Sequence, residues 1–149
     1  MTFGFDVSER IISELISVGN YFIQLAFYAE YGYILPMRPV YMISGGITKF
    51  AKAHPEKDFR LMVKEAFDYA LHDVPNLTRD MIDGSVCSYF SDHFARQLMS
   101  GAMVQDYLGL CPKPSKRVEG GGATGGLCFQ AAWEAVASGR MEICAALGF

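Results

Sequence analysis

Short apolar runs alternate with segments of helical periodicity from residue 37 onward, and this alternation most limits the folds open to the chain. A continuous apolar run indicates a buried strand, and apolar residues three or four apart indicate an amphipathic helix. Strands are predicted over 40–44, 81–88, 115–118 and 141–149, and helices over 58–72, 91–108 and 125–138. The βαβαβαβ order predicts an α/β fold, with a mostly parallel sheet covered by helices.

Local signals support the three helices. Asp58 suits a helix N-terminus electrostatically, and Gly109 and Gly139 suit helix ends. In the helix predicted over 91–108, the periodicity assigns Phe94, Leu98, Met99, Ala102 and Met103 to the apolar face.

The first 36 residues read as a separate part of the chain. Residues 11–35 are the most apolar stretch, but Glu14 and Glu30 interrupt it, and the charge-free piece 15–29 is shorter than a membrane span of about 20 residues. No basic cluster flanks it, which disfavours a secretory signal as well. We expect 1–36 to be an appended amphipathic helix, or an artefact preceding a start at Met37. Residues 37–149 then form one domain.

Composition excludes several classes of function. The net charge is −3 and the 13 Lys and Arg residues are scattered, so no nucleic-acid partner is expected. The four cysteines form no CxxC pair, which predicts reduced thiols, no metal site and a cytoplasmic location. A membrane association is not expected either.

The stretch RVEGGGATGG, residues 117–126, is the densest glycine cluster, and so much glycine suggests a close approach to the backbone. Gly120, Gly122 and Gly125 match the G-x-G-x-x-G spacing of dinucleotide sites. The preceding SKRVE is polar, however, and the next strand ends without a carboxylate to hold a ribose. A Walker loop would need a Gly-Lys-Ser/Thr that does not follow. A purely structural role, with the helix start pressed against a neighbouring strand, also stays open.

Five segments in order give a resemblance to a known family. They are MRPVYMISGGITKF, the helix over 58–72, IDGSVCSYFSD, RVEGGGATGG and the closing EICAALGF. Together they resemble the N-terminal half of a thiolase, most of all the sterol-carrier-protein and archaeal acetoacetyl-CoA types. The resemblance covers about residues 37–149 and implies that the C-terminal half is missing from this sequence.

Thiolases condense or cleave acyl-CoA thioesters through an acyl-cysteine at the N-terminus of a buried helix, where the helix dipole lowers the pKa of a thiol. The resemblance implies that Gly122 stands at the position of that cysteine, in a substrate-binding loop with Gly121, Ala123, Thr124 and Gly125. Glycine cannot form a thioester. The chain alone is therefore expected to be inactive, with a coenzyme A thioester as substrate and no permanently bound cofactor.

Two hypotheses follow from the resemblance. The chain is either an acyltransferase of lipid metabolism, truncated and altered at residue 122, or a non-catalytic domain that binds an acyl-CoA or a partner subunit. Cys87 is the reserve nucleophile, since it lies near the end of a strand, whereas Cys128 is expected in the core. The expected partner is a second copy, through Ser115–Val118, or a complementary C-terminal-half chain.

Overall fold

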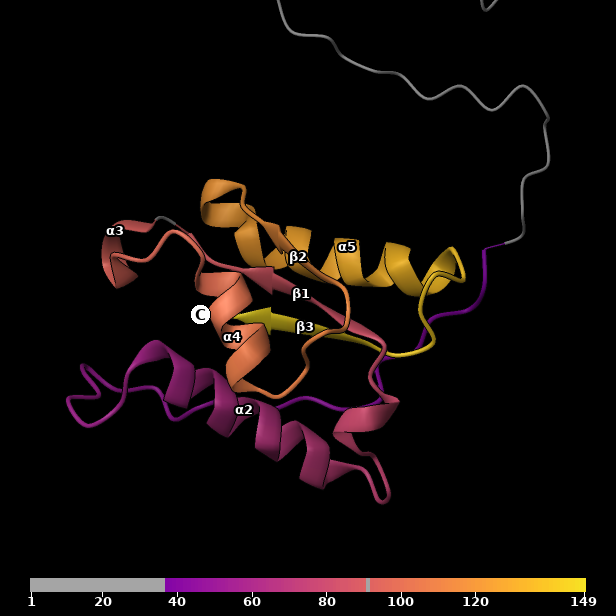
Figure 1. The fold of residues 1–149 in the computed structure, drawn as a ribbon, viewed down its shortest axis with the longest axis horizontal. Coiled ribbons are helices and arrows are strands. Elements are labelled where there is room, and N and C mark those ends of the chain that lie inside the picture. Colours follow the sequence, from indigo (N-terminus) through magenta and orange to yellow (C-terminus); the bar gives the residue numbers. More distant parts are fainter. Residues whose placement is uncertain (1–36, 91) are drawn as a thin grey trace, which may run out of the picture. The chain divides into compact units, whose positions relative to one another are not determined.

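Three parallel strands form the centre of the structure, a computed structural model that describes residues 37–90 and 92–149 (Figure 1). The predicted segment 1–36 lies outside the described residues. The elements are α2 (Phe59–Asp73), η1 (Arg79–Met81), β1 (Gly84–Ser88), α3 (Asp92–Ala95), α4 (Ser100–Tyr107), β2 (Ser115–Val118), η2 (Gly121–Ala123), α5 (Thr124–Ala137) and β3 (Cys144–Gly148).

The sheet has the order β2-β1-β3, and β1 pairs in parallel with both neighbours. Val86 at the middle of β1 lies opposite Lys116 on β2 and Ala146 on β3. Parallel pairing requires a crossover between successive strands. Here α4 lies between β1 and β2 in the chain, and α5 lies between β2 and β3. The predicted α/β class with a parallel sheet is confirmed.

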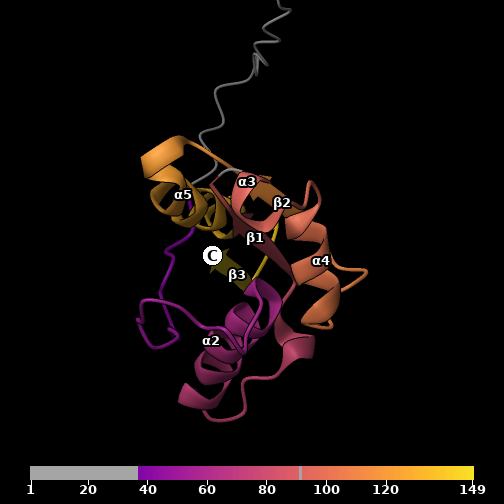
Figure 2. The same cartoon turned by 90° about the vertical axis from the view of Figure 1, so that its left-hand side faces the viewer.

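Helices cover both faces of the sheet, so the fold has three layers (Figures 1 and 2). On one face α5 packs through Cys128, Ala131 and Ala132 against Val86. On the other face α2 and α4 pack against the sheet. The core on that second side consists of Val63, Phe67, Ile82, Cys87, Val104, Leu108, Leu110 and Leu147.

Helix α2 follows its sequence prediction closely. The Oδ1 of Asp58 accepts a hydrogen bond of 3.0 Å from the N–H of Leu61, which satisfies one of the free donors at the helix start. Val63 and Phe67, one turn apart, are the buried residues of the helix. The apolar stripe therefore meets the sheet as the periodicity indicates.

The continuous helix predicted over 91–108 is wrong. The structure has two helices, α3 and α4, and Arg96 between them has a φ of 49°, which ends the first. Leu98 and Met99, predicted on the apolar face, are exposed. The face of α4 that meets the sheet instead begins with small residues, and a Cβ added to Gly101 would lie 3.4 Å from the Cβ of Cys87.

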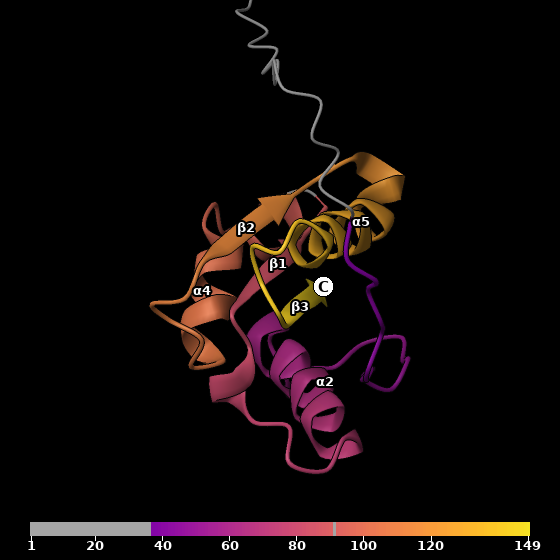
Figure 3. The ribbon, with the colours of Figure 1, turned by 90° about the vertical axis from the view of Figure 1, so that its right-hand side faces the viewer.

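The strand predicted over 40–44 is also wrong, because the segment pairs with no strand of the described residues. A strand needs a neighbour for its backbone groups, and an apolar pattern does not reveal whether one is present. In Figures 2 and 3 this part of the chain runs past β3 on the side away from β1. Tyr41 is 78% exposed. The predicted four-stranded order is thus reduced to three strands among the described residues.

Candidate functional site

The glycine loop, residues 119–126, comprises the connection after β2, including η2, and the first three residues of α5. Because all three strands are parallel, β1, β2 and β3 end at the same edge of the sheet, at Ser88, Val118 and Gly148. Ligands of open parallel sheets bind outside this carboxyl edge. The loop therefore occupies the position where this class of fold builds its sites.

One threonine fixes the shape of the loop. Thr124 Oγ1 accepts a hydrogen bond of 2.9 Å from the N–H of Gly120 and donates one of 2.6 Å to the C=O of Gly121. Gly121 has a φ of 58°, a left-handed conformation that glycine adopts at little cost. Ala123 N–H closes the turn on Gly120 C=O at 3.1 Å.

The space around residue 122 does not require a glycine there. A Cβ built on it would meet no atom within 4 Å, and the same holds for Gly125 and Gly126. Only at Gly120 would an added Cβ clash within the loop, at 2.2 Å from Cδ1 of Leu127. The expected close approach to the backbone is thus found at Gly120 alone among the described contacts, and a side chain at residue 122 fits.

The start of α5 offers free backbone donors. The first four N–H groups of a helix have no partner within it. The N–H groups of Ala123 and Thr124 bind the carbonyls of Gly120 and Gly121, which leaves those of Gly125 and Gly126. Both glycines are exposed, and the helix dipole places positive potential there. A carbonyl oxygen or an anion can be bound at this point.

Cys87, the reserve nucleophile, lies in the core. Its side chain is 0% exposed and its Sγ lies 3.8 Å from the C=O of Gly101. Burial raises the pKa of this thiol. Cys87 belongs to the cluster on the α2 and α4 face, whereas α5 packs on the opposite face. These observations do not favour Cys87 as a reactive thiolate.

Cys128 lies in the core as predicted, and the structure places the remaining two cysteines as well. Cys128 is buried between α5 and the sheet, and its Sγ donates to Val86 C=O at 3.2 Å. Burial raises the pKa of the Cys128 thiol. Burial also raises the pKa of Cys144, to about 11. Cys111 is exposed in the connection between α4 and β2. Among the described residues no group of three or more His, Cys, Asp and Glu side chains is placed to hold a metal ion.

Arg117 organises the entrance to the loop, a role that its position in a polar strand did not indicate. Its Nη1 lies 2.7 Å from Asp92 Oδ1 and its Nη2 lies 2.8 Å from Glu119 Oε2. The guanidinium also stacks over Tyr89, 5.7 Å from the ring centroid. These contacts tie the carboxyl ends of β1 and β2 together.

A hollow of about 390 Å³ lies beside the loop, between β2 and α5. Glu119 and Glu134 contribute carboxylates to it, and its one cation among the described residues, Arg117, is already paired with two carboxylates. This hollow is therefore unsuited to the phosphates of a coenzyme, since like charges repel them.

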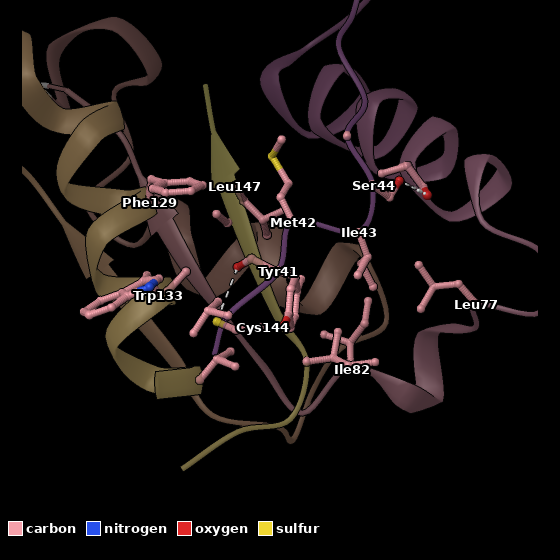
Figure 4. Close-up of a pocket in the computed structure, with 18 of the residues that line it drawn as sticks. Tyr41, Met42, Ile43, Ser44, Leu77, Ile82, Phe129, Trp133, Cys144 and Leu147 are labelled. Atoms are coloured by element: carbon pink, nitrogen blue, oxygen red, sulfur yellow. Dashed lines mark hydrogen bonds between the residues drawn. The ribbon is translucent and has the colours of Figure 1, made fainter. Parts of the chain in front are cut away.

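A larger cavity of about 880 Å³ lies at the opposite edge of the sheet, beside β3 (Figure 4). Its walls are α5, α2, the edge of β3 and the segment 38–46. The lining is mostly aliphatic and aromatic. No pattern in the sequence indicates this cavity, because its walls come from segments far apart in the chain.

Fold and loop together define a class: a parallel α/β fold with a helix start presented at the carboxyl edge of its sheet. The chain is similar to an acetyl-CoA acetyltransferase of Methanothermobacter thermautotrophicus, with 35% identity over 112 residues. The alignment covers 75% of this chain but only 29% of that relative. No family model matches the chain. The similarity supports a relationship to the thiolase family.

The described part of the chain contains no helix that is both long and apolar enough to cross a membrane.

Proposed function

We propose that this chain is a thiolase-type acyltransferase domain whose glycine loop binds the carbonyl of an acyl-CoA thioester without forming an acyl-enzyme. The similarity to an acetyl-CoA acetyltransferase supports the acyl-CoA class of substrate. The observation that carries the proposal is the open space around Gly122 at the start of α5. A cysteine would fit there, and glycine supplies no nucleophile.

In this proposal the N–H groups of Gly125 and Gly126 bind the carbonyl oxygen of the thioester. Two backbone donors at a helix start resemble an oxyanion hole, which stabilises the charge that develops on a carbonyl. Gly121, Ala123 and Thr124 act as positioning residues, because they set the direction in which those donors point. A complete acyl transfer with turnover would need a nucleophile at residue 122 and further acid and base groups, which the glycines of the loop do not supply.

The proposed partner is a second copy or a complementary chain, in a cytoplasmic setting. The edge position of β2 supports a subunit contact there, since the outer backbone groups of Ser115–Val118 face no other strand of the described residues. The polar side chains of this strand fit a contact that is polar or wet, and they also fit an edge that deters pairing. Light scattering that finds a strict monomer at all concentrations would remove the second-copy proposal.

Backbone NMR of the full chain tests the loop proposal. Addition of acetyl-CoA is expected to shift the amide resonances of Gly125 and Gly126 most, with no covalent adduct by mass spectrometry. Coenzyme A without the acetyl group is the control, and should shift these two amides less. Equal shifts with both ligands, or shifts confined to residues that line the large cavity, would contradict binding of the thioester carbonyl at the helix start.

A further inference from the structure

Arg117 lies between two carboxylates beside the glycine loop. Its Nη1 is 2.7 Å from Asp92 Oδ1, and its Nη2 is 2.8 Å from Glu119 Oε2. Asp92 is the first residue of α3, which lies beyond the ends of β1 and β3 to which their arrows point (Figure 1). We call these three side chains the Arg117 cluster. Its net charge is −1, because one cation is paired with two anions.

The guanidinium of Arg117 is held in place from several sides. Nη1 also donates to the C=O of Leu98 at 3.3 Å, and Nη2 donates to the C=O of Tyr89 at 3.4 Å. The Tyr89 ring below the guanidinium stacks in turn on Phe149, with 4.8 Å between ring centroids. The Arg117 side chain is 24% exposed. A charge that is fixed and partly shielded from water acts more strongly on its surroundings than one on a free surface side chain.

The elements around the loop carry few other charges. Strands β1 and β3 contain no charged residue. Strand β2 adds Lys116, and α5 adds Glu134, ten residues past the first residue of the helix and thus about 15 Å along its axis. At the start of α2, Asp58 and Arg60 form a neutral pair. The Arg117 cluster is therefore the main source of side-chain potential at the loop among these elements.

The cluster is close enough to the start of α5 to act on it. Glu119 precedes Gly122 by three residues, so their Cα atoms lie at most about 11 Å apart. The Debye length at physiological ionic strength is about 8 Å. Negative charge at this distance opposes the positive potential that the helix dipole gives to the N–H groups of Gly125 and Gly126. Without Arg117 the cluster would have a net charge of −2 and would cancel more of that potential.

We propose that Arg117 is a positioning residue that preserves the positive potential at the start of α5 by pairing with the carboxylates of Asp92 and Glu119. It acts through these two side chains and does not touch the bound group. The inference rests on the function proposed for the glycine loop, since this potential is what would stabilise a thioester carbonyl there. Arg117 thus sets the affinity of the loop for a carbonyl oxygen or an anion from a distance.

A thiol introduced at residue 122 reports this potential in the absence of any acyl-CoA. Gly122→Cys has room for its side chain, and the thiolate, rather than the thiol, reacts with iodoacetamide. The alkylation rate is measured from about pH 5 to about pH 10 in the full chain, with Cys111→Ser to remove an exposed thiol. Peptide mass spectrometry assigns the adduct. The midpoint of the rate profile gives the pKa of the introduced thiol, and the plateau gives the access of the reagent.

Three variants of this parent change the net charge of the cluster in known steps. Arg117→Met gives −2 and should slow alkylation about threefold on the rising limb of the profile, because added negative charge disfavours the thiolate. Glu119→Gln gives 0 and should speed it about threefold. The double variant restores −1 and should match the parent within about 1.5-fold. The plateau rate should stay the same in all three.

Two further variants serve as controls. Arg117→Lys keeps the positive charge and should alkylate within about twofold of the parent. Lys116→Met removes a cation from the preceding position of β2, whose side chain points to the opposite face of the sheet, and should change the rate by less than about 1.5-fold. Salt at about 1 M should reduce the effect of Arg117→Met, because the Debye length falls to about 3 Å.

An unchanged midpoint in Arg117→Met would overturn the proposal. So would a double variant as slow as Arg117→Met, an equal effect of Lys116→Met, or a slower plateau with the same midpoint, which would mean that Arg117 controls access alone. If circular dichroism shows that Arg117→Met does not fold, Glu119→Gln decides the question, and alkylation no faster than in the parent contradicts the proposal. None of these results bears on acyl-CoA binding at Gly125 and Gly126, which the NMR experiment above measures separately.

Discussion

Gly120 and Thr124 are joined by a hydrogen bond of 2.9 Å from backbone N–H to side-chain Oγ1, and this contact bridges the end of β2 and the first turn of α5. The same hydroxyl binds the C=O of Gly121, so one side chain closes the loop from both directions. Thr124 is 6% exposed, which shields both bonds from water.

Replacement of Thr124 by valine should therefore cost about 1–2 kcal/mol of unfolding free energy, because a buried acceptor and a donor disappear without substitutes. Urea unfolding followed by circular dichroism measures the change. Thr124→Ser keeps the hydroxyl and should lose less than half as much. Equal losses in both variants would show that the methyl group contributes as much as the hydrogen bonds, and no loss in the valine variant would show that the hydrogen bonds do not hold the loop.

Gly121 and Gly122 differ in why they are glycine: Gly121 has a left-handed backbone conformation, whereas a Cβ at Gly122 would meet no neighbouring atom. Gly121→Ala forces a side chain into a left-handed conformation and should destabilise the fold by about 1–2 kcal/mol. Gly122→Ala has room for its Cβ and should change stability by less than about 0.5 kcal/mol. Thermal unfolding of the two variants side by side checks this. A large loss at residue 122 would mean that the space around it is filled in solution.

Thiol labelling tests the reserve nucleophile. Cys87 is fully buried and Cys111 is exposed, so iodoacetamide at neutral pH should modify Cys87 at least about tenfold more slowly than Cys111. Peptide mapping by mass spectrometry assigns each adduct. Cys111→Ser serves as the control for peptide assignment. Faster labelling of Cys87 in the folded chain would restore it as a candidate nucleophile.

Asp83 links stability to pH at the start of β3. Its Oδ2 accepts hydrogen bonds from the N–H groups of Ile143, at 3.0 Å, and Glu142, at 2.7 Å, and these lower the pKa of the carboxyl below its usual value. A lowered folded-state pKa contributes stability above the unfolded pKa of about 3.9, and that stability is lost as pH falls through the folded pKa.

Asp83→Asn should therefore be less stable than the wild type at pH 7, by about 0.5–1 kcal/mol because Asp83 is exposed. The difference should shrink as pH falls below about 4. Guanidinium unfolding at several pH values measures it. A difference that stays constant down to about pH 2 would show that the charge of Asp83 is not the cause.

Periodicity predicted the parts of the fold that depend on one element at a time. Strand β2 has the predicted bounds, Ser115–Val118, and α5 begins and ends one residue before its predicted range of 125–138. The break at Arg96 escaped prediction because a left-handed arginine leaves no pattern in the sequence. The sequence also failed to predict that residues 40–44 form no strand, since strand pairing depends on a neighbouring strand rather than on the apolar run itself.

The candidate site also has parts that the sequence predicted and parts that it did not. The glycine loop is visible in the sequence. The role proposed for Gly122 rests on a resemblance to a family, and the similarity to an acetyl-CoA acetyltransferase supports the family relationship but does not test that role. Arg117 and the cavity beside β3 were not predictable, because each joins residues from elements far apart in the chain.

Acetylation of a Gly122→Cys variant tests the central claim most directly. In the expected step the thiolate of the introduced cysteine attacks the carbonyl of acetyl-CoA, a new S–C bond forms, the bond to the coenzyme A sulfur breaks, and the coenzyme leaves as a thiolate that takes up a proton. Incubation with acetyl-CoA followed by intact-mass and peptide mass spectrometry should show one acetyl group at residue 122, more than on exposed Cys111, and none on the wild type. A folded variant that stays unmodified at residue 122, or a wild type acetylated on Cys87, would contradict the assignment of Gly122 to the nucleophile position.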